Sequence, residues 1–272
     1  MTDFAFIDSG VGGIPYMLEL LKKQPDSSCI YVADSVNFPY GPKTHEQVVE
    51  CIVPLVEKII NRFDPAVIVL ACNTISVNAL EVLRSKFEGA KFVGTVPAIK
   101  LASSVSKKRC IGLLATKATC ENPYNQELKD NFASDCKLVC RPDGELVSFI
   151  EKNAFTATKE ECLAAVKPAV DFFRQNDCDV IILGCTHFLN FTQVFKEACA
   201  PDISVVDSVD GVVRQMIKVR GALRPLRQAQ EPQGLQGPRE PSLYITSTQN
   251  EDEQKKYEFI CSHFNISFGG NI

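Results

Sequence analysis

The stretch VIVLACNT at residues 67–74 is an apolar run that ends in a small residue, a cysteine and two polar residues. The stretch VIILGCTH at residues 180–187 follows the same pattern. A short uninterrupted apolar run is typical of a strand that is buried on both faces of a parallel sheet. Ligands of such sheets bind beyond the carboxyl ends of the strands. Cys72 and Cys185 are therefore the first candidates for functional residues.

The rest of the chain alternates between short apolar runs and amphipathic stretches, which indicates an α/β fold. We expect strands at residues 4–7, 29–32, 67–70, 91–93, 110–114, 137–140, 180–183, 204–206 and 243–246. We expect helices at residues 14–23, 45–62, 76–87, 98–106, 121–134, 159–176, 191–200, 211–220 and 251–263. The predicted fold class is two doubly wound parallel-sheet domains related by pseudo-symmetry, with the active site in the cleft between them.

The two cysteine stretches suggest an internal duplication, because the predicted strand ends at Asp8 and Thr116 show a similar offset along the chain. We place the first domain at residues 1–97 and 208–272, so that the C-terminal segment returns to it, and the second at residues 98–207. Residues 220–241 are rich in Pro, Gln and Gly and are expected to form a long loop.

Composition and charge exclude several classes of function. The chain has 272 residues, a net charge of −4 and no cluster of basic residues of the kind that nucleic-acid binding needs. No stretch reaches the length of a membrane span, and the N-terminus lacks the features of a signal peptide. The twelve cysteines are therefore expected to be reduced thiols in a cytoplasm. They include no C-x-x-C pair, so we expect no metal site.

Two thiols on opposite sides of a ligand suit racemisation at Cα, because one removes a proton from one face while the other delivers a proton to the opposite face. The ordinary pKa of cysteine allows both roles. Each cysteine precedes polar residues and a predicted helix start, and this position is expected to lower the pKa of Cys72. Asp8 could hold a ligand ammonium or orient a thiol, and His187 could exchange protons near neutral pH.

Four motifs together resemble the glutamate racemase family: DSGVGG at residues 8–13, VADSVNFPYG at 32–41, ACNT at 71–74 and GCTHF at 184–188. This resemblance implies catalytic roles for Cys72, Cys185, Asp8, His187 and Glu151. It implies substrate-binding roles for Ser9, Pro39, Tyr40, Gly41, Asn73, Thr74, Thr116, Thr119 and Thr186.

The resemblance also implies a reaction and its partners. The reaction is the cofactor-independent interconversion of L-glutamate and D-glutamate, which supplies D-glutamate for bacterial peptidoglycan. The expected partners are glutamate, a second copy of the chain in a homodimer and a peptidoglycan precursor as effector. Neither nucleic acid nor membrane is expected, and no motif presents a lysine for a pyridoxal phosphate Schiff base.

Three alternatives stay open. An aspartate racemase uses the same two-cysteine chemistry, although the DSG opening and the PYG turn favour glutamate. A non-catalytic amino-acid-binding protein could share the fold, but it would not need the thiol pair. A thiol–disulfide oxidoreductase would predict a bond between Cys72 and Cys185 and a C-x-x-C-like site, and the sequence lacks such a site.

Overall fold

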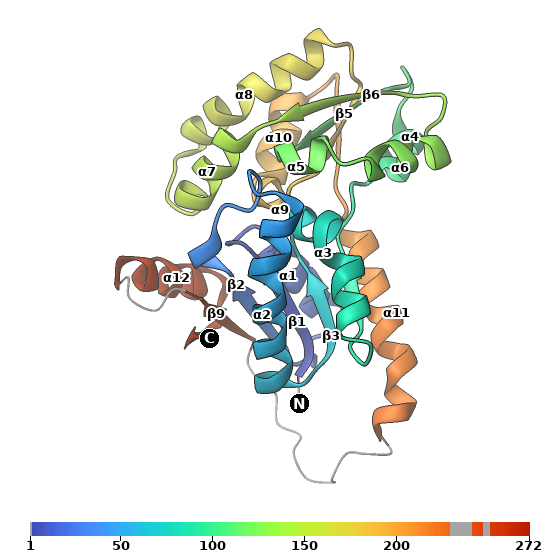
Figure 1. Cartoon of the computed structure of the whole chain (residues 1–272). Coiled ribbons are helices and arrows are strands. Elements are labelled where there is room, and N and C mark those ends of the chain that lie inside the picture. Colours follow the sequence, from blue (N-terminus) through green and yellow to red (C-terminus); the bar gives the residue numbers. More distant parts are fainter. Residues whose placement is uncertain (1, 229–240, 247–250) are drawn as a thin grey trace.

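The computed structural model describes residues 2–228, 241–246 and 251–272, which form two parallel β-sheets flanked by helices (Figure 1). The first sheet has the strand order β10-β9-β2-β1-β3-β4, and the second has the order β6-β5-β7-β8. All paired strands run parallel. The predicted fold class, two parallel-sheet α/β domains, is confirmed.

The strands of the first sheet are β1 (Thr2–Asp8), β2 (Cys29–Ala33), β3 (Pro65–Leu70), β4 (Phe92–Gly94), β9 (Ser242–Ile245) and β10 (Ser267–Asn271). Those of the second sheet are β5 (Cys110–Ala115), β6 (Lys137–Pro142), β7 (Val180–Leu183) and β8 (Ser204–Val206). The helices near the first sheet are α1 (Ile14–Lys23), the 3-10 helix η1 (Ser35–Asn37), α2 (His45–Phe63), α3 (Asn73–Lys86), α11 (Val209–Gln228) and α12 (Glu251–Phe264). Those near the second are α4 (Ile99–Val105), α5 (Lys117–Cys120), α6 (Tyr124–Phe132), α7 (Gly144–Asn153), α8 (Lys159–Gln175), α9 (Thr186–Leu189) and α10 (Thr192–Cys199).

Strand β1 explains why the apolar runs are continuous. Phe4 and Phe6 point into one hydrophobic cluster, whereas Ala5 and Ile7 point into another on the opposite face. Successive side chains of a strand alternate between its faces, so a sheet with helices on both faces needs apolar residues at every position. Strand β3 is buried along its whole length in the same way.

One hydrophobic cluster joins the two domains. It contains Phe6 and Val69 from the first sheet together with Leu114 and Ile181 from the second. The opposite faces of the two sheets pack separately, against α2 and α3 in the first domain and against α4 and α6 in the second. The two domains are therefore fixed against each other by a shared core.

The two sheets repeat one topology. The order β2-β1-β3-β4 in the first sheet matches the order β6-β5-β7-β8 in the second. Cys72 follows β3 and Cys185 follows β7, so the two cysteines occupy equivalent positions. Asp8 ends β1, and Thr116 directly follows β5. This equivalence agrees with the internal duplication inferred from the sequence.

The expected loop at residues 220–241 is wrong in its first part, because α11 continues to Gln228. Ala222 and Leu223 are strong helix formers, Leu223 packs on the shared core, and Arg220 forms an ion pair with Asp3. These contacts prolong the helix beyond the predicted end at Arg220. Residues 229–240 lie outside the described part of the chain.

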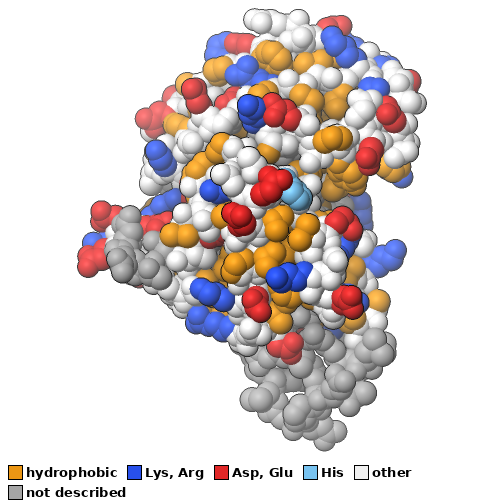
Figure 2. All heavy atoms as spheres, in the orientation of Figure 1, with side chains coloured by type: hydrophobic (Ala, Val, Ile, Leu, Met, Phe, Trp, Pro, Cys, Tyr) orange, Lys and Arg blue, Asp and Glu red, His pale blue; other side chains and the backbone are white. Residues whose placement is uncertain are grey.

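The face drawn in Figure 2 carries Lys and Arg side chains interspersed with Asp and Glu side chains. This face therefore presents no broad field of one sign to a charged partner. Among the helices that the structure describes, we find none with the length and apolar character that a membrane crossing requires.

Candidate active site

Cys72 and Cys185 line the same cavity, which has a volume of about 280 Å³. Cys72 is the N-cap residue of α3 and Cys185 is the N-cap residue of α9, and both have extended backbone angles. Both thiols are buried, with exposed fractions of 6% and 5%. Helix α3 begins at Asn73, three residues before the predicted start, so Cys72 lies directly at a helix terminus.

Most of the predicted site residues line this cavity: Ser9, Pro39, Tyr40, Gly41, Cys72, Asn73, Thr74, Thr116, Cys185, Thr186 and His187. The other predicted residues are Asp8, Thr119 and Glu151, which lie behind that lining and hydrogen-bond to residues in it. The cavity is therefore made from the carboxyl ends of strands in both sheets, where the fold class predicts ligands.

Asp8 is fully buried at the end of β1 and accepts hydrogen bonds from several donors. Ser9 donates its backbone N–H to Oδ1 at 2.7 Å, and Thr186 donates its hydroxyl to Oδ2 at 3.0 Å. Burial raises the pKa of Asp8, while the charge of His187 and these hydrogen bonds oppose the shift. Because Thr186 belongs to the second domain, Asp8 contacts both halves of the site.

Cys72 does not have the lowered pKa that its position before a helix predicted. Burial raises its pKa well above the ordinary value, and the charge of Asp8 adds to that shift. The backbone N–H of Ile75 opposes the shift, but it is the weaker effect. The expectation was wrong because desolvation of a buried thiolate outweighs a helix terminus. Asp8 and Cys72 are both shifted toward their protonated forms.

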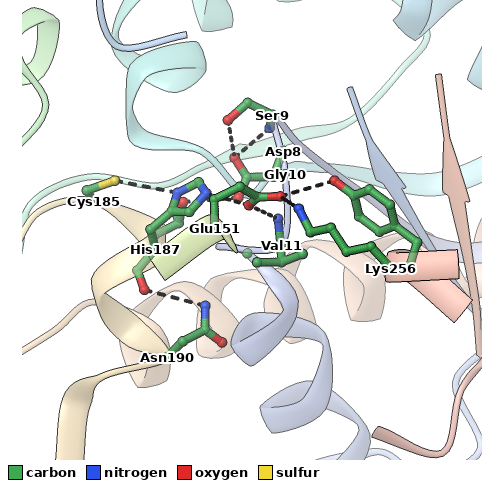
Figure 3. Close-up of polar contacts among 12 residues, drawn as sticks. Asp8, Ser9, Gly10, Val11, Glu151, Cys185, His187, Asn190 and Lys256 are labelled. Carbon is green, nitrogen blue, oxygen red and sulfur yellow. Dashed lines mark hydrogen bonds and ion pairs between the residues drawn. The ribbon is translucent and has the colours of Figure 1, made fainter. Parts of the chain in front are cut away.

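His187 lies between the second thiol and a buried carboxylate (Figure 3). Its Nδ1 is 3.8 Å from Cys185 Sγ, and its Nε2 is 2.9 Å from Glu151 Oε2. Burial alone would lower the pKa of His187, but its contacts with Cys185 and Glu151 raise it well above the ordinary value. The imidazolium form can therefore donate from both ring nitrogens, from Nδ1 toward Cys185 Sγ and from Nε2 to Glu151 Oε2.

Glu151, on α7, is only 6% exposed and every oxygen of its carboxylate is hydrogen-bonded. Oε2 accepts from His187 and from the backbone N–H of Val11 at 2.9 Å. Oε1 accepts from Lys256 Nζ at 2.5 Å and from the Tyr257 hydroxyl at 3.3 Å. Burial would raise the pKa of Glu151, but His187 and Lys256 outweigh it and lower the pKa to about 2.

Asn73 has one buried polar atom without a hydrogen-bond partner. Its Nδ2 donates a hydrogen bond to the carbonyl oxygen of Gly184, whereas its buried Oδ1 has no partner. A buried amide oxygen without a donor is costly, and Asn73 lines the cavity. Oδ1 is therefore an unpaired acceptor in a residue that lines the cavity.

Three threonine hydroxyls connect the domains on the other side of the cavity. Thr74 Oγ1 and Thr116 Oγ1 are 2.9 Å apart, and Thr116 donates to Thr119 Oγ1 at 3.1 Å. A hydroxyl has one proton, so Thr74 is the donor to Thr116. Thr116 also caps α5 by accepting from the backbone N–H of Thr119.

The turn at residues 38–42 covers the cavity from the first domain. The Tyr40 hydroxyl donates to Asp34, and this contact holds the buried ring in place. Gly41 lies so close to the second domain that an added Cβ would be 3.1 Å from Thr116 Cβ. The Phe38 ring lies 5.7 Å from the His187 ring. The turn therefore needs a small residue at Gly41.

Sequence reasoning missed part of the lining: Lys117, Pro142, Gly144, Val147 and Ser148. It also missed Lys256 and Tyr257. The Asp143-Gly144 pair after a predicted strand was an available signal, since Asp143 caps α7 by accepting from the backbone N–H of Leu146 at 3.0 Å. No comparable signal marks Lys256. Within residues 2–228, 241–246 and 251–272, no group of three His, Cys, Asp or Glu side chains could hold a metal ion.

Comparison with known proteins gives concordant results. Residues 14–216 match the family model described as Asp/Glu/Hydantoin racemase. A protein of Treponema pallidum (strain Nichols) named glutamate racemase is 36% identical over 267 residues, which are 98% of this chain and 95% of that protein. The glutamate racemase of Proteus mirabilis (strain HI4320) is 36% identical over 209 residues, 76% of this chain and 72% of that protein.

A solved structure agrees with these sequence matches. The Escherichia coli glutamate racemase, crystallised with L-glutamate and the activator UDP-MurNAc-ala, superimposes with a TM-score of 0.84 at 26% identity. The superposition covers 100% of this chain and 98% of the E. coli chain.

Proposed function

This chain belongs to the Asp/Glu/hydantoin racemase family, and from this membership we propose that it interconverts L-glutamate and D-glutamate without a cofactor. One observation carries the proposal: two cysteines at equivalent strand ends of two different sheets line one cavity. A racemase needs an acid or base on each face of Cα, and a duplicated fold supplies one from each domain.

The proposed mechanism uses the two thiols in opposite protonation states. A thiolate at one cysteine removes the Cα proton, and the thiol of the other delivers a proton to the opposite face. The Nδ1 of the His187 imidazolium lies 3.8 Å from Cys185 Sγ and can donate a hydrogen bond to it. Burial and Asp8 favour thiol at Cys72. We propose that Cys185 is the base and Cys72 the acid for one antipode, and that these roles are exchanged for the other antipode.

The remaining side chains of the cavity are proposed to hold the substrate. Asn73 lines the cavity, and a side-chain rotation that exposes its unpaired Oδ1 would let it accept from the substrate ammonium, which must stay protonated because its charge acidifies Cα. A substrate carboxylate would redirect hydroxyl protons of Ser9, Thr74, Thr116 or Thr186, which now point to other protein oxygens, and would also accept from the N–H groups beside them. In a buried cavity these donors stabilise the negative charge that develops at Cα and at the adjacent carboxylate.

Glutamate is favoured over aspartate by the relatives at 36% identity that are named glutamate racemase. The E. coli structure carries L-glutamate and the activator UDP-MurNAc-ala, which supports glutamate as substrate and a peptidoglycan precursor as effector here. A supply of D-glutamate for peptidoglycan, and so for cell-wall biogenesis and cell shape, follows from that proposal. From the family resemblance we also propose that the chain forms a homodimer. A cytoplasmic location is part of the proposal because it would keep the required thiols reduced.

Exchange of the substrate Cα proton for deuterium in deuterated buffer tests the proposal. The purified, reduced protein is incubated without added cofactor with each antipode of glutamate and of aspartate. Loss of the Cα proton is followed by NMR, and inversion by circular dichroism. Exchange and inversion of glutamate alone support the proposal, whereas turnover of aspartate reassigns the substrate. Binding of glutamate without exchange would favour an amino-acid-binding protein instead.

A further inference from the structure

The C-terminal helix α12 packs beside the first sheet, but its Lys256 side chain contacts Glu151 of the second domain. Lys256 Nζ lies 2.5 Å from Oε1 of Glu151, which belongs to α7 (Figure 3). The other carboxylate oxygen of Glu151 is 2.9 Å from Nε2 of His187, whose Nδ1 faces Cys185. Lys256, Glu151, His187 and Cys185 therefore form one continuous row of contacts.

The charges along this row alternate. The Lys256 ammonium and the His187 imidazolium lie on opposite sides of the Glu151 carboxylate. The side chain of Glu151 is 6% exposed and that of Lys256 is 32% exposed, so the row runs from partial solvent exposure into the buried site. Burial of the Glu151 carboxylate has a desolvation cost, and two cation partners offset more of that cost than one would. Opposite charges also interact strongly where water is excluded.

Lys256 also differs from its neighbours on α12. Its ammonium lies 5.0 Å from the centre of the Tyr257 ring, and the Tyr257 hydroxyl donates to the same Glu151 oxygen as Lys256 does. Lys255, one residue earlier, is exposed. Two consecutive residues of α12 thus contact one buried carboxylate, while the adjacent lysine points to solvent.

We propose that Lys256 is a positioning residue for racemisation, which acts through Glu151 and His187 on the proton transfer at Cys185. This inference rests on the proposed function and assigns the C-terminal helix a part in it. Lys256 itself does not line the cavity. Its ammonium fixes and partly neutralises the carboxylate that orients His187 toward the thiol.

Other titratable groups also face this row. Asp8 on β1 interacts with His187, and Tyr31 on β2 and Tyr257 on α12 interact with Glu151. Glu253 on α12 interacts with Tyr257. Apart from Lys256 and His187 these groups are neutral or negative, so removal of Lys256 leaves the region more negative. Protons bound there become harder to remove, and the acid limb of the pH–rate profile must move to higher pH.

The test compares Lys256→Met with Lys255→Met, which removes the same charge one position away. The wild-type chain is measured first. We expect Lys256→Met to lower kcat about tenfold or more, the effect of one pKa unit, with a smaller change in KM. Lys255→Met should keep the wild-type rate, and Lys256→Arg should regain most of it because it restores the cation. Lys256→Gln, which keeps a donor to Glu151 without the charge, replaces Lys256→Met if that variant does not fold.

Isotope effects separate this role from a general loss of structure. Cys185 acts in the first proton transfer for one glutamate antipode and in the second transfer for the other. The substrate carries deuterium at Cα. If Lys256→Met slows only the proton transfer at Cys185, the primary deuterium isotope effect on kcat/KM rises for the antipode from which Cys185 removes the proton. It falls for the antipode to which Cys185 delivers a proton. A merely structural defect changes both antipodes alike.

The outcomes distinguish the two proposals. A wild-type chain that inverts no amino acid would overturn the proposed function and this inference with it. An active wild type whose Lys256→Met variant matches Lys255→Met in rate, pH profile and isotope effects would overturn this inference alone. An isotope effect that changes in opposite directions for the two antipodes, with the acid limb moved to higher pH, supports it.

Discussion

Asn73, the residue after the first cysteine, donates a side-chain hydrogen bond to the carbonyl oxygen of Gly184, the residue before the second cysteine. The two cysteine segments, which sequence analysis related by pattern alone, are thus joined directly across the domain boundary. An added Cβ on Gly184 would be 2.5 Å from Leu113 Cδ1, so the buried Leu113 side chain would have to shift. The bond fixes the backbone on which each thiol is carried, and with it the separation of the two thiols.

Replacement of either Cys72 or Cys185 by alanine should abolish inversion of glutamate, with a rate loss of about a thousandfold or more, because both directions need both thiols. The measurement is initial rate by circular dichroism with each antipode. Cys162→Ala is the matched control: Cys162 is a buried thiol on α8 that does not line the cavity, so its loss should leave the rate near wild type. Normal turnover by either of the first two variants would contradict the two-thiol mechanism.

Glu151→Gln should destabilise the protein in a pH-dependent manner. The pKa of Glu151 falls from 4.5 to about 2 on folding, because His187 and Lys256 outweigh the effect of burial. Such a carboxyl stabilises the fold at pH above its unfolded pKa, and this contribution is lost as the pH falls toward the folded pKa. The free energy of unfolding of the wild type should exceed that of the variant by roughly 3 kcal/mol at neutral pH.

Urea unfolding at pH 7, 5, 4 and 3 checks this expectation. The difference in free energy of unfolding between wild type and Glu151→Gln should stay constant from pH 7 to pH 5 and shrink below about pH 4.5. A difference that does not change with pH would mean that the charge of Glu151 contributes no stability.

Gly12→Ala should lower both stability and activity. The added Cβ would lie 2.6 Å from Thr186 Oγ1 and 2.7 Å from the backbone nitrogen of His187, so both cavity residues would have to shift. Overpacking of this kind costs about 1–3 kcal/mol. Gly89→Ala is the control, because an added Cβ there meets nothing within 4 Å. Equal melting temperatures and rates for the two variants would show that the contact at Gly12 is unimportant.

Thr116→Val should weaken both the fold and substrate binding. The change removes the hydroxyl that joins Thr74 to Thr119 and caps α5, at a cost of about 1–2 kcal/mol. We expect KM for glutamate to rise about tenfold, the effect of one lost hydrogen bond to a charged group.

Thr44→Val provides the comparison, since Thr44 caps α2 in the same manner but does not line the cavity. It should lose similar stability with unchanged KM. A rise in KM for both variants would indicate that stability, and not contact with the substrate, controls binding.

The sequence predicted the buried strands β1, β2, β3, β5 and β7 well, because each is a continuous apolar run. It missed β10 (Ser267–Asn271), which contains two glycines and is only partly buried. It also placed Cys72, Asn73, Cys185 and Thr186 at strand ends, and the parallel-sheet rule then brought them to one cavity. The structure adds their positions, while their roles stay predictions. The end of α11 was predicted less well, because the helix is prolonged by a tertiary ion pair between Arg220 and Asp3 that no local pattern reveals.

Two parts of the site could not be predicted from local sequence. The pKa of Cys72 depends on how deeply the thiol is buried and on the distance to Asp8, and neither quantity is visible in the pattern ACNT. Lys256 belongs to an exposed-looking charged stretch, and only the return of α12 to the first sheet brings it against Glu151. Contacts between elements far apart in the chain follow from packing, and local propensity does not specify them.

The position of the solvent-derived proton tests the two-thiol account most directly. L-glutamate is incubated with the protein in deuterated buffer, and the reaction is stopped while less than about a tenth is converted. Two thiols that act on opposite faces predict D-glutamate that carries deuterium at Cα, because the delivering thiol has exchanged with solvent, and remaining L-glutamate that is still protiated. D-glutamate that retains the original proton, or L-glutamate that gains deuterium as fast as D-glutamate forms, would contradict the account and indicate a single base.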